Sequence, residues 1–258
     1  MSSVLPQVAA LARRSIVRTV RQPASIVFPL IFPMLLLLVN SGGLAASTKL
    51  PGFPTDSFLA FALAVPFIQG ALFSTMNAGT DLAKDIQTGF LNRLSLTSMR
   101  GVALIAGQLA GVVAMGLVQA GFYIAVGLAV GVDFASGALG ILLLFLFAAV
   151  ISTSFGAIGT FLALRTGSGE AIQGLFPILF VFLFLSSMNT PRDLIAVDWF
   201  HFVASINPVS YLIECVRSLI ITGWSAQALL LGFGIAIAIG MVATVLSTLS
   251  LKERLART

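Results

Sequence analysis

Charged side chains are scarce in this sequence. Asp, Glu, Lys and Arg make up 9% of the 258 residues, whereas hydrophobic residues make up 58%. A soluble domain has about 25% charged residues, and so few charges could not cover a core of this size. The composition therefore excludes an ordinary soluble protein and indicates an integral membrane protein.

Cysteine and histidine are nearly absent. Cys215 is the single cysteine and His201 is the single histidine. One cysteine excludes an intrachain disulfide and a cysteine-cluster metal site. One histidine, beside Trp199 and Phe200, is typical of an interfacial residue and leaves no nucleophile–base pair. We therefore expect no metal site, no catalytic residue and no enzyme activity.

The sequence also lacks a phosphate-binding loop. Its three lysines are Lys49, Lys84 and Lys252, and none of them follows a glycine. This excludes a G-x-x-x-x-G-K-[ST] motif. We expect the chain to bind neither ATP nor another cofactor by itself.

Six stretches contain no charged residue. They cover residues 22–48, 57–80, 101–132, 134–164, 171–191 and 218–251, and the shortest has 21 residues. A membrane-spanning helix needs about 20 apolar residues, and a backbone in hydrocarbon has to satisfy its own hydrogen bonds. The sequence predicts an all-α integral membrane fold with six transmembrane helices, in one domain over residues 1–258.

Lysine and arginine are distributed unevenly around these spans. With a cytoplasmic N-terminus, 11 of the 14 lie on the cytoplasmic side, and only Lys49, Arg192 and Arg217 lie outside. This bias sets membrane orientation, so both termini are predicted to be cytoplasmic. The net charge of +5 reflects this topology, and no nucleic-acid partner is expected.

Residues 1–23 precede the first span and are predicted to form an interfacial elbow helix. Arg14, Arg18 and Arg21 share one side of this helix, and apolar residues fill the opposite side. Such a helix lies in the interface with its arginines near anionic lipid head groups. It is either a topology anchor alone or also a contact for a cytoplasmic partner.

Two connections between spans are unusual. In the cytoplasmic loop 79–100, Leu82, Ile86 and Phe90 recur at four-residue spacing, which predicts a helix across the cytoplasmic face that serves as a docking surface. The outside segment 189–225 is apolar but interrupted, which favours a re-entrant hairpin over another span.

The re-entrant hairpin is expected to break at Asn207 and Pro208. Glu214 and Arg217 follow, three residues apart on one helical face. We expect these two side chains to form an ion pair that pins the hairpin.

The spans offer few ionisable groups. The fourth and sixth have none, whereas ion-coupled carriers usually need carboxylates near the midplane. Aromatic and weakly polar side chains are predicted to form a groove for an apolar or amphipathic cargo, although a single phenylalanine could equally face lipid. The expected groove residues are Phe28, Asn40, Pro66, Gln69, Phe73, Met76, Phe176 and Phe180.

The chain resembles the membrane subunit of ATP-binding cassette transporters of the type 2 exporter class, especially the daunorubicin-resistance-like drug-efflux permeases. The most specific matches are a D…G…RL…R pattern in the cytoplasmic loop and an N-P…E…R segment before the last span. The resemblance implies that the residues coupling to an ATPase are Asp81, Asp85, Gly89, Leu91, Arg93, Leu94 and Arg100, and that the hairpin uses Asn207, Pro208, Glu214 and Arg217. The proline that the family usually has near Ser98 and Met99 is missing here.

The resemblance also implies a mechanism and partners. A separate ATPase dimer, which binds ATP and Mg, would hold the loop helix and rearrange two permease chains in the lipid membrane. The implied activity is export of a drug, lipid or glycolipid, and the implied location is a bacterial inner membrane. Two other classes stay open: an ion-coupled secondary transporter, and a non-transporting membrane assembly factor.

Overall fold

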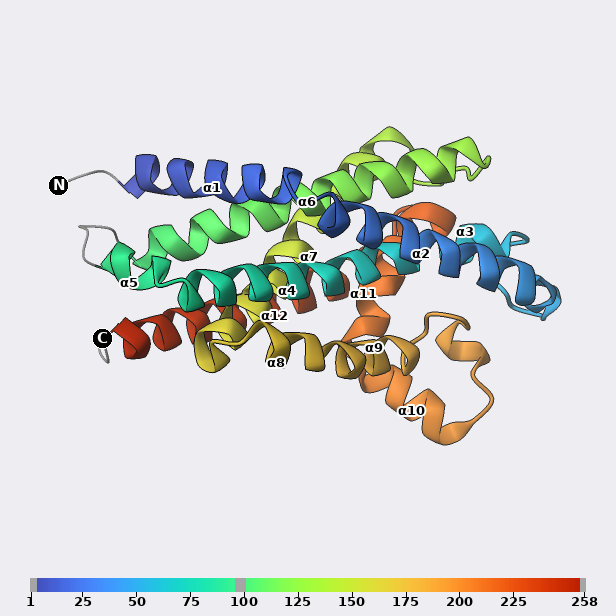
Figure 1. The fold of residues 1–258 in the computed structure, drawn as a ribbon. Coiled ribbons are helices and arrows are strands. Elements are labelled where there is room, and N and C mark those ends of the chain that lie inside the picture. Colours follow the sequence, from blue (N-terminus) through green and yellow to red (C-terminus); the bar gives the residue numbers. More distant parts are fainter. Residues whose placement is uncertain (1–3, 96–100, 256–258) are drawn as a thin grey trace.

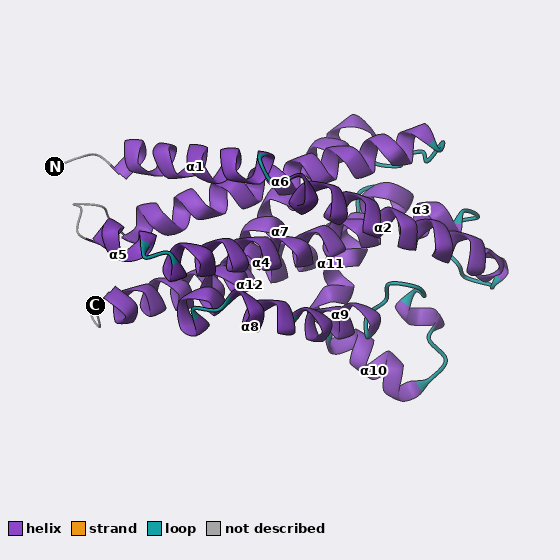
Figure 2. Ribbon diagram, in the orientation of Figure 1, coloured by secondary structure: helices purple, strands orange, loops and turns teal. Residues whose placement is uncertain are grey.

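The computed structural model describes residues 4–95 and 101–255, and all regular elements in these two ranges are helices (Figure 2). In chain order they are α1 (Val4–Val20), α2 (Pro23–Gly43), the 3-10 helix η1 (Ala45–Lys49), α3 (Phe58–Ala62), α4 (Ala64–Gln87), α5 (Phe90–Ser95), α6 (Gly101–Ala129), α7 (Gly137–Thr166), α8 (Gly169–Gly174), α9 (Phe176–Phe184), the 3-10 helix η2 (Arg192–Leu194), α10 (Asp198–Ile206), α11 (Pro208–Arg217), the π-helical turn η3 (Ser218–Thr222) and α12 (Ala226–Leu255). The expected all-α fold is confirmed over these residues.

Five helical segments of the described chain are long and apolar enough to cross a membrane: α2, α3 with α4, α6, α7 and α12. The segment expected to span over 171–191 instead contains two short helices, α8 and α9, which meet at Leu175. Pro177 explains the break, because it has no N–H to donate to the carbonyl of Gln173, four residues earlier. The fifth expected span is therefore a shorter, interrupted apolar helix beside five full-length ones.

Helix α4 is the centre of the bundle. In the most apolar 18-residue stretch of Phe58–Gln87, 89% of the residues are buried, against 22% for α2 and 17% for α12. Any Cβ added at Gly159 of α7 would overlap the backbone oxygen of Thr75. Small residues of this kind let membrane helices approach closely, so α7 packs tightly along α4.

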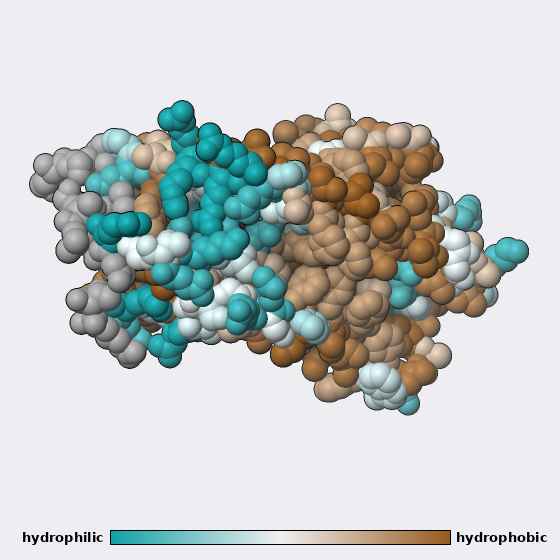
Figure 3. Space-filling model, viewed as in Figure 1, coloured by the Kyte–Doolittle hydropathy of each residue, from teal (hydrophilic) through white to brown (hydrophobic). Residues whose placement is uncertain are grey.

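The outer surface carries a broad apolar region. Large hydrophobic side chains such as Val39, Leu142 and Leu230 are more than half exposed. Hydrophobic residues dominate one half of the face in Figure 3, and hydrophilic residues gather over the part that contains α1. Exposed apolar surface on this scale is suited to lipid rather than water, as expected for a multi-pass membrane protein.

Helix α1 does not lie across the ends of the spans, as an interfacial elbow would. It runs alongside the first half of α6 (Figure 1). Added Cβ atoms at Gly107 and Gly111 of α6 would overlap Leu11 and Ser15 of α1, respectively. Because these contacts advance by four residues on both helices, the two helices lie parallel over about one turn or more.

Two prolines interrupt the hydrogen bonding of α2. Pro29 and Pro33 have no N–H, so the carbonyls of Ser25 and Pro29 lose their helical donors. Side chains of other helices replace them: Tyr123 Oη of α6 donates to the Pro29 carbonyl at 2.7 Å, and Asn77 Nδ2 of α4 donates to the Ser25 carbonyl at 3.4 Å. The first span is thereby attached to α4 and α6 where its own hydrogen bonds are missing.

The two ends of the described chain approach one side of the molecule. The start of α1, the helix α5 and the end of α12 lie at one end of the bundle in Figure 1, whereas α10 and the α2–α3 and α6–α7 connections lie at the other. This arrangement agrees with an even number of membrane crossings. The assignment of the first end to the cytoplasm stays a prediction.

Candidate functional site

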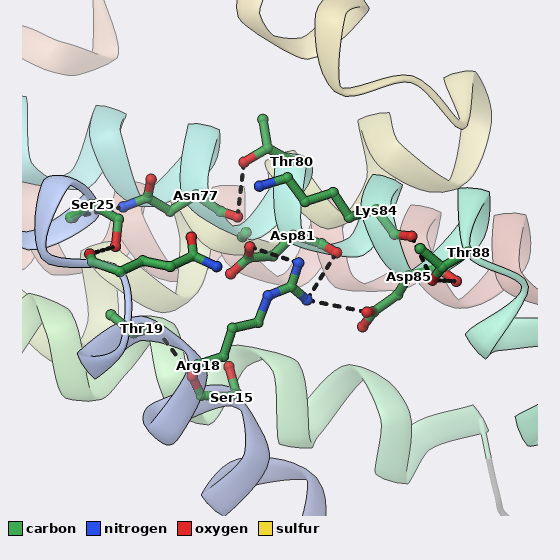
Figure 4. A network of polar contacts seen from close by, with 12 residues as sticks. Ser15, Arg18, Thr19, Ser25, Asn77, Thr80, Asp81, Lys84, Asp85 and Thr88 are labelled. Atoms are coloured by element: carbon green, nitrogen blue, oxygen red, sulfur yellow. Dashed lines mark hydrogen bonds and ion pairs between the residues drawn. The ribbon is translucent and has the colours of Figure 1, made fainter.

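Four charged side chains meet where α1 passes α4, and we call them the charge cluster: Arg14, Arg18, Asp81 and Asp85. Arg14 contacts Asp85 with both terminal nitrogens, at 2.8 and 2.7 Å from the two carboxylate oxygens. Arg18 lies 3.1 Å from Asp85 and 3.1 Å from Asp81 (Figure 4). Bidentate charged pairs form strong hydrogen bonds, and those to Asp85 raise the pKa of Arg14 above its ordinary value.

The two acids face the inside of the molecule rather than a docking partner. The sequence places Asp81 and Asp85 on the polar side of a separate loop helix, but α4 continues through both positions. Asp85 is buried and Asp81 is half-buried, each against an arginine that lies 63 to 71 residues earlier in the chain. The charge cluster therefore fixes α1 to the end of α4, and these arginines bind carboxylates within the chain.

A tight turn divides the helix that the sequence predicts over 79–100. α4 ends at Gln87, Gly89 has a φ of +68°, and α5 begins at Phe90. A Cβ added at Gly89 would meet nothing within 4 Å, so the backbone conformation rather than space favours glycine. The guanidinium carbon of Arg14 lies 3.9 Å from the centre of the Phe90 ring, which joins this turn to the charge cluster.

The remaining coupling residues have different surroundings. Leu91 is 2% exposed and belongs to a small apolar cluster, so it packs under the turn instead of forming its surface. Arg93 is exposed. Arg100 and the side chain of Leu94 lie outside the described residues. Arg93 is thus the described member of the set best placed to meet a partner.

Five phenylalanines from three helices form an aromatic cluster: Phe28 and Phe32 of α2, Phe73 of α4, and Phe176 and Phe180 of α9. The ring centre of Phe73 lies 5.3 to 6.4 Å from those of the other four. Rings at such separations attract one another. Phe73 is 5% exposed and Phe28 is 55% exposed, so the cluster extends from the interior to the surface. Phe32 is absent from the sequence prediction, although it lies one helical turn from Phe28.

The other four predicted groove residues do not join the aromatic cluster. Pro66 and Gln69 are buried within the bundle, Met76 packs against the apolar cluster near α5, and Asn40 lies in the last turn of α2. Among the described residues, Gln69 Oε1 and Gln119 Nε2 are buried without a hydrogen-bond partner. Such unsatisfied groups are rare in folded proteins. Here they are two polar amide side chains buried between α4 and α6.

Asn207 joins α9 to the α10–α11 hairpin. Its Nδ2 donates to the carbonyls of Phe182 and Leu185 at 2.6 and 3.0 Å, near the end of α9. Its Oδ1 accepts from the backbone N–H of Val209 at 3.0 Å, at the start of α11. Because helix ends leave backbone groups unpaired, one amide side chain stabilises two helix ends. Pro208 then begins α11, where a missing N–H costs little.

Glu214 and Arg217 do not form the ion pair that the sequence predicts. Glu214 Oε2 lies 2.7 Å from Arg192 Nη2, and its Oε1 accepts from Ser187 Oγ at 3.0 Å. Arg217 is buried, and its Nη1 and Nη2 donate at 3.0 Å to the carbonyls of Ser187 and Met188. These carbonyls follow the end of α9 and have no helical donor, so they attract the arginine instead.

Other kinds of site are not apparent in the described part of the chain. Over residues 4–95 and 101–255, no group of three or more His, Cys, Asp or Glu side chains could hold a metal ion. Cys215 is a buried thiol in α11. The features that remain are a charge cluster, an exposed turn, an aromatic cluster and a fixed hairpin.

Comparisons of the sequence with known proteins identify a family and several relatives. A family model described as ABC-2 type transporter covers residues 6–221. The chain is 27% identical over 200 residues to the daunorubicin resistance ABC transporter permease protein DrrB1 of Streptomyces coeruleorubidus, covering 75% of this chain and 66% of that protein. It is 27% identical to the putative transport permease ycf38 of Porphyra purpurea (83% and 74% covered) and 26% identical to that of Pyropia yezoensis (84% and 75%).

The family match includes α2 through α11 in full, and with them the aromatic cluster and the hairpin. It also begins before Arg14, so it contains the whole charge cluster. The chain is therefore a member of the ABC-2 type transporter family, a multi-pass membrane permease.

Proposed function

We propose that this chain is the translocating subunit of an ATP-driven exporter that moves an apolar or amphipathic cargo. The observation that supports it best is the aromatic cluster between α2, α4 and α9, because packed aromatic rings offer a contact surface for apolar molecules and no charge for an ion. The name of the Streptomyces relative supports a drug as cargo. Lipid and glycolipid cargo fit the same chemistry.

The proposed energy source is an ATPase dimer that binds ATP and Mg and contacts the exposed turn at Gly89 and Arg93. Helix α4 links that turn to the transport path, because Phe73 lies 14 residues before Gln87 on one continuous helix, a distance of about 21 Å. ATP binding would shift the permease between two states only through a difference in contacts between them. A second permease chain, identical or related, would complete the path.

The proposed orientation puts both termini on the cytoplasmic side of a bacterial inner membrane. The uneven distribution of lysine and arginine supports it, as does the position of α1, α5 and the end of α12 at one end of the bundle. A cysteine introduced at Lys252 should then be protected from an impermeant thiol reagent in intact cells, whereas one at Asp198 should react. Reaction at Lys252 alone would reverse the orientation.

Transport in proteoliposomes tests the function. The chain, reconstituted with its ATPase, should move an amphipathic dye only when ATP is present, and Phe73→Ala should reduce the rate. Phe182→Ala is the matched control, because Phe182 is 50% exposed on α9 and contacts no ring of the cluster. Transport driven by an ion gradient without ATP would favour a secondary transporter, and partner binding without transport would favour an assembly factor.

A further inference from the structure

A small polar chamber lies between α1, α4 and α6, beside the junction of α1 and α2. Its volume is about 50 Å³. The lining residues that matter here are Thr19, Ser25, Asn77, Thr80, Asp81 and Lys84, and Figure 4 shows them along α4 and at the junction of α1 and α2. The transport proposal does not use this chamber, because the aromatic cluster contributes no residue to its lining.

The walls of the chamber present hydrogen-bond acceptors. The hydroxyls of Thr19, Ser25 and Thr80 donate their hydrogens to backbone carbonyls of their own segments, at 3.1, 2.7 and 2.8 Å, and keep their oxygen lone pairs. Asn77 uses its Nδ2 on the Ser25 carbonyl, which leaves Oδ1. Arg18 contacts Asp81 through Oδ1, and within the described residues no donor reaches Oδ2. Such a chamber attracts a cationic donor.

The size of the chamber limits what can enter. Its volume of about 50 Å³ compares with about 30 Å³ for one water molecule in the liquid, so only a small group can enter. The aminoethyl end of an ethanolamine head group, two carbons and an ammonium, is small and has three N–H donors. A choline head group has a trimethylammonium without N–H donors, so it cannot donate to these acceptors.

The chamber lies at the level where lipid head groups are expected. The first span begins at Pro23, next to the chamber residues Gln22 and Ser25. In Figure 3 the surface changes from hydrophilic to hydrophobic in the region where α1 ends and α2 begins. Lys84 is exposed at the chamber and forms no ion pair among the described residues, so its ammonium is free for a lipid phosphate.

We propose that this chamber binds the head group of an ethanolamine phospholipid from the adjacent leaflet. The lipid ammonium donates to Asp81 Oδ2 and Asn77 Oδ1, and the phosphate lies against Lys84. The bound lipid thereby joins α1, α2 and α4 at the charge cluster. Lipid binding at this site needs only a membrane-inserted chain, so it can be tested independently of the transport proposal.

Lipid competition measured by native mass spectrometry tests the site. The purified full chain is mixed with equal amounts of phosphatidylethanolamine, phosphatidylcholine and phosphatidylglycerol that carry identical acyl chains. Wild type should retain the ethanolamine lipid about tenfold more than the choline lipid, because hydrogen bonds to charged groups contribute this much. Equal retention of all three lipids would overturn the proposal. Preferential retention of phosphatidylglycerol would show simple anion capture and overturn it too.

Variants distinguish lipid binding in the chamber from attraction of lipid to any exposed cation. Asn77→Leu fills the chamber and removes an acceptor for the ammonium, so it should lose most of the ethanolamine preference. Lys84→Ala removes a contact to the phosphate that all three lipids share, so it should weaken the retention of all three. Lys252→Ala is the control, because Lys252 is an exposed cation at the end of α12, and it should keep both the preference and the retention. Circular dichroism and gel filtration identify variants that fail to fold. If Asn77→Leu is folded and retains the full ethanolamine preference, the assignment is wrong.

Discussion

The guanidinium of Arg217 lies 3.5 Å from the centre of the Phe61 ring, and its Nε donates to the Phe61 backbone carbonyl at 3.2 Å. The same side chain binds the carbonyls of Ser187 and Met188. One buried cation thus joins α11, the chain after α9 and the end of α3. Its partners are carbonyl dipoles and a ring, which together replace the water that a buried charge loses.

Replacing Arg217 should destabilise the protein strongly. Arg217→Ala leaves three buried carbonyls without donors, and each unsatisfied group costs about 1–3 kcal/mol. Arg217→Lys should recover only part of this, because an ammonium lacks the planar set of donors. In thermal unfolding in detergent, the midpoint temperature should fall from wild type to Arg217→Lys to Arg217→Ala. An Ala variant as stable as wild type would show that water reaches these carbonyls.

Glu214 should be coupled to Arg192 and not to Arg217. A double-mutant cycle between Glu214 and Arg192 should give a coupling energy near 1 kcal/mol, since this pair is partly exposed. Exchanging the charges of Glu214 and Arg217 should not restore stability, because the carbonyls around Arg217 would then face a carboxylate. Recovery by that exchange would contradict the observed pairing.

Asp85→Asn should impair the permease more than Asp81→Asn. Asp85 accepts three hydrogen bonds, two from Arg14 and one from Arg18, whereas the Asp81 carboxylate contacts Arg18 alone. Loss of the bidentate pair should lower stability by about 1–3 kcal/mol and release α1 from α4. Unfolding and ATP-driven transport are measured for both variants. Equal effects would mean that Arg18 alone maintains the cluster.

Gly89 should tolerate asparagine better than valine. Its positive φ disfavours β-branched residues, whereas asparagine adopts this conformation readily, and the space around it is open to either side chain. Gly89→Val should therefore strain the turn before α5 and reduce transport with the ATPase, while Gly89→Asn keeps most of it. Equal losses would indicate that a partner needs the bare backbone at this point.

Tyr123→Phe should destabilise the protein, because Pro33 provides no backbone N–H for the Pro29 carbonyl. Without the Tyr123 hydroxyl, the Pro29 carbonyl is buried and unpaired, at a cost of about 1–3 kcal/mol. Pro33→Ala restores a backbone N–H four residues after Pro29, so Tyr123→Phe should cost little in that background. A double-mutant cycle of unfolding free energies measures this. Additive effects would show that the hydroxyl serves another purpose.

Local patterns in the sequence predicted much of the fold. Five of the six charge-free stretches correspond to long helices, because a membrane-spanning helix needs about 20 apolar residues. The break in the hairpin at Asn207 and Pro208 is likewise predicted from the local sequence. The prediction of a continuous fifth span is wrong, because the absence of charge over 171–191 does not distinguish a continuous helix from one that Pro177 interrupts.

The pairing of charges could not be read in the same way. Arg14 and Asp85 are far apart in the chain, and only the packing of α1 beside α6 brings them together. The Glu214–Arg217 prediction relied on helical spacing, which is correct for the backbone. Helical spacing gives no information about the carbonyls after the end of α9 that bind Arg217, or about Arg192, which reaches Glu214.

The distance between Arg14 and Asp85 along the chain has a consequence for synthesis. Asp85 is made 71 residues after Arg14, and at about 5–20 residues per second the ribosome needs roughly 4–14 s to reach it. During this interval the arginines of α1 have no carboxylate to bind and remain with water and lipid. Helix α1 is therefore made well before its packing partner α6 and can reach its final position only after Gly107 and Gly111 of α6 have emerged.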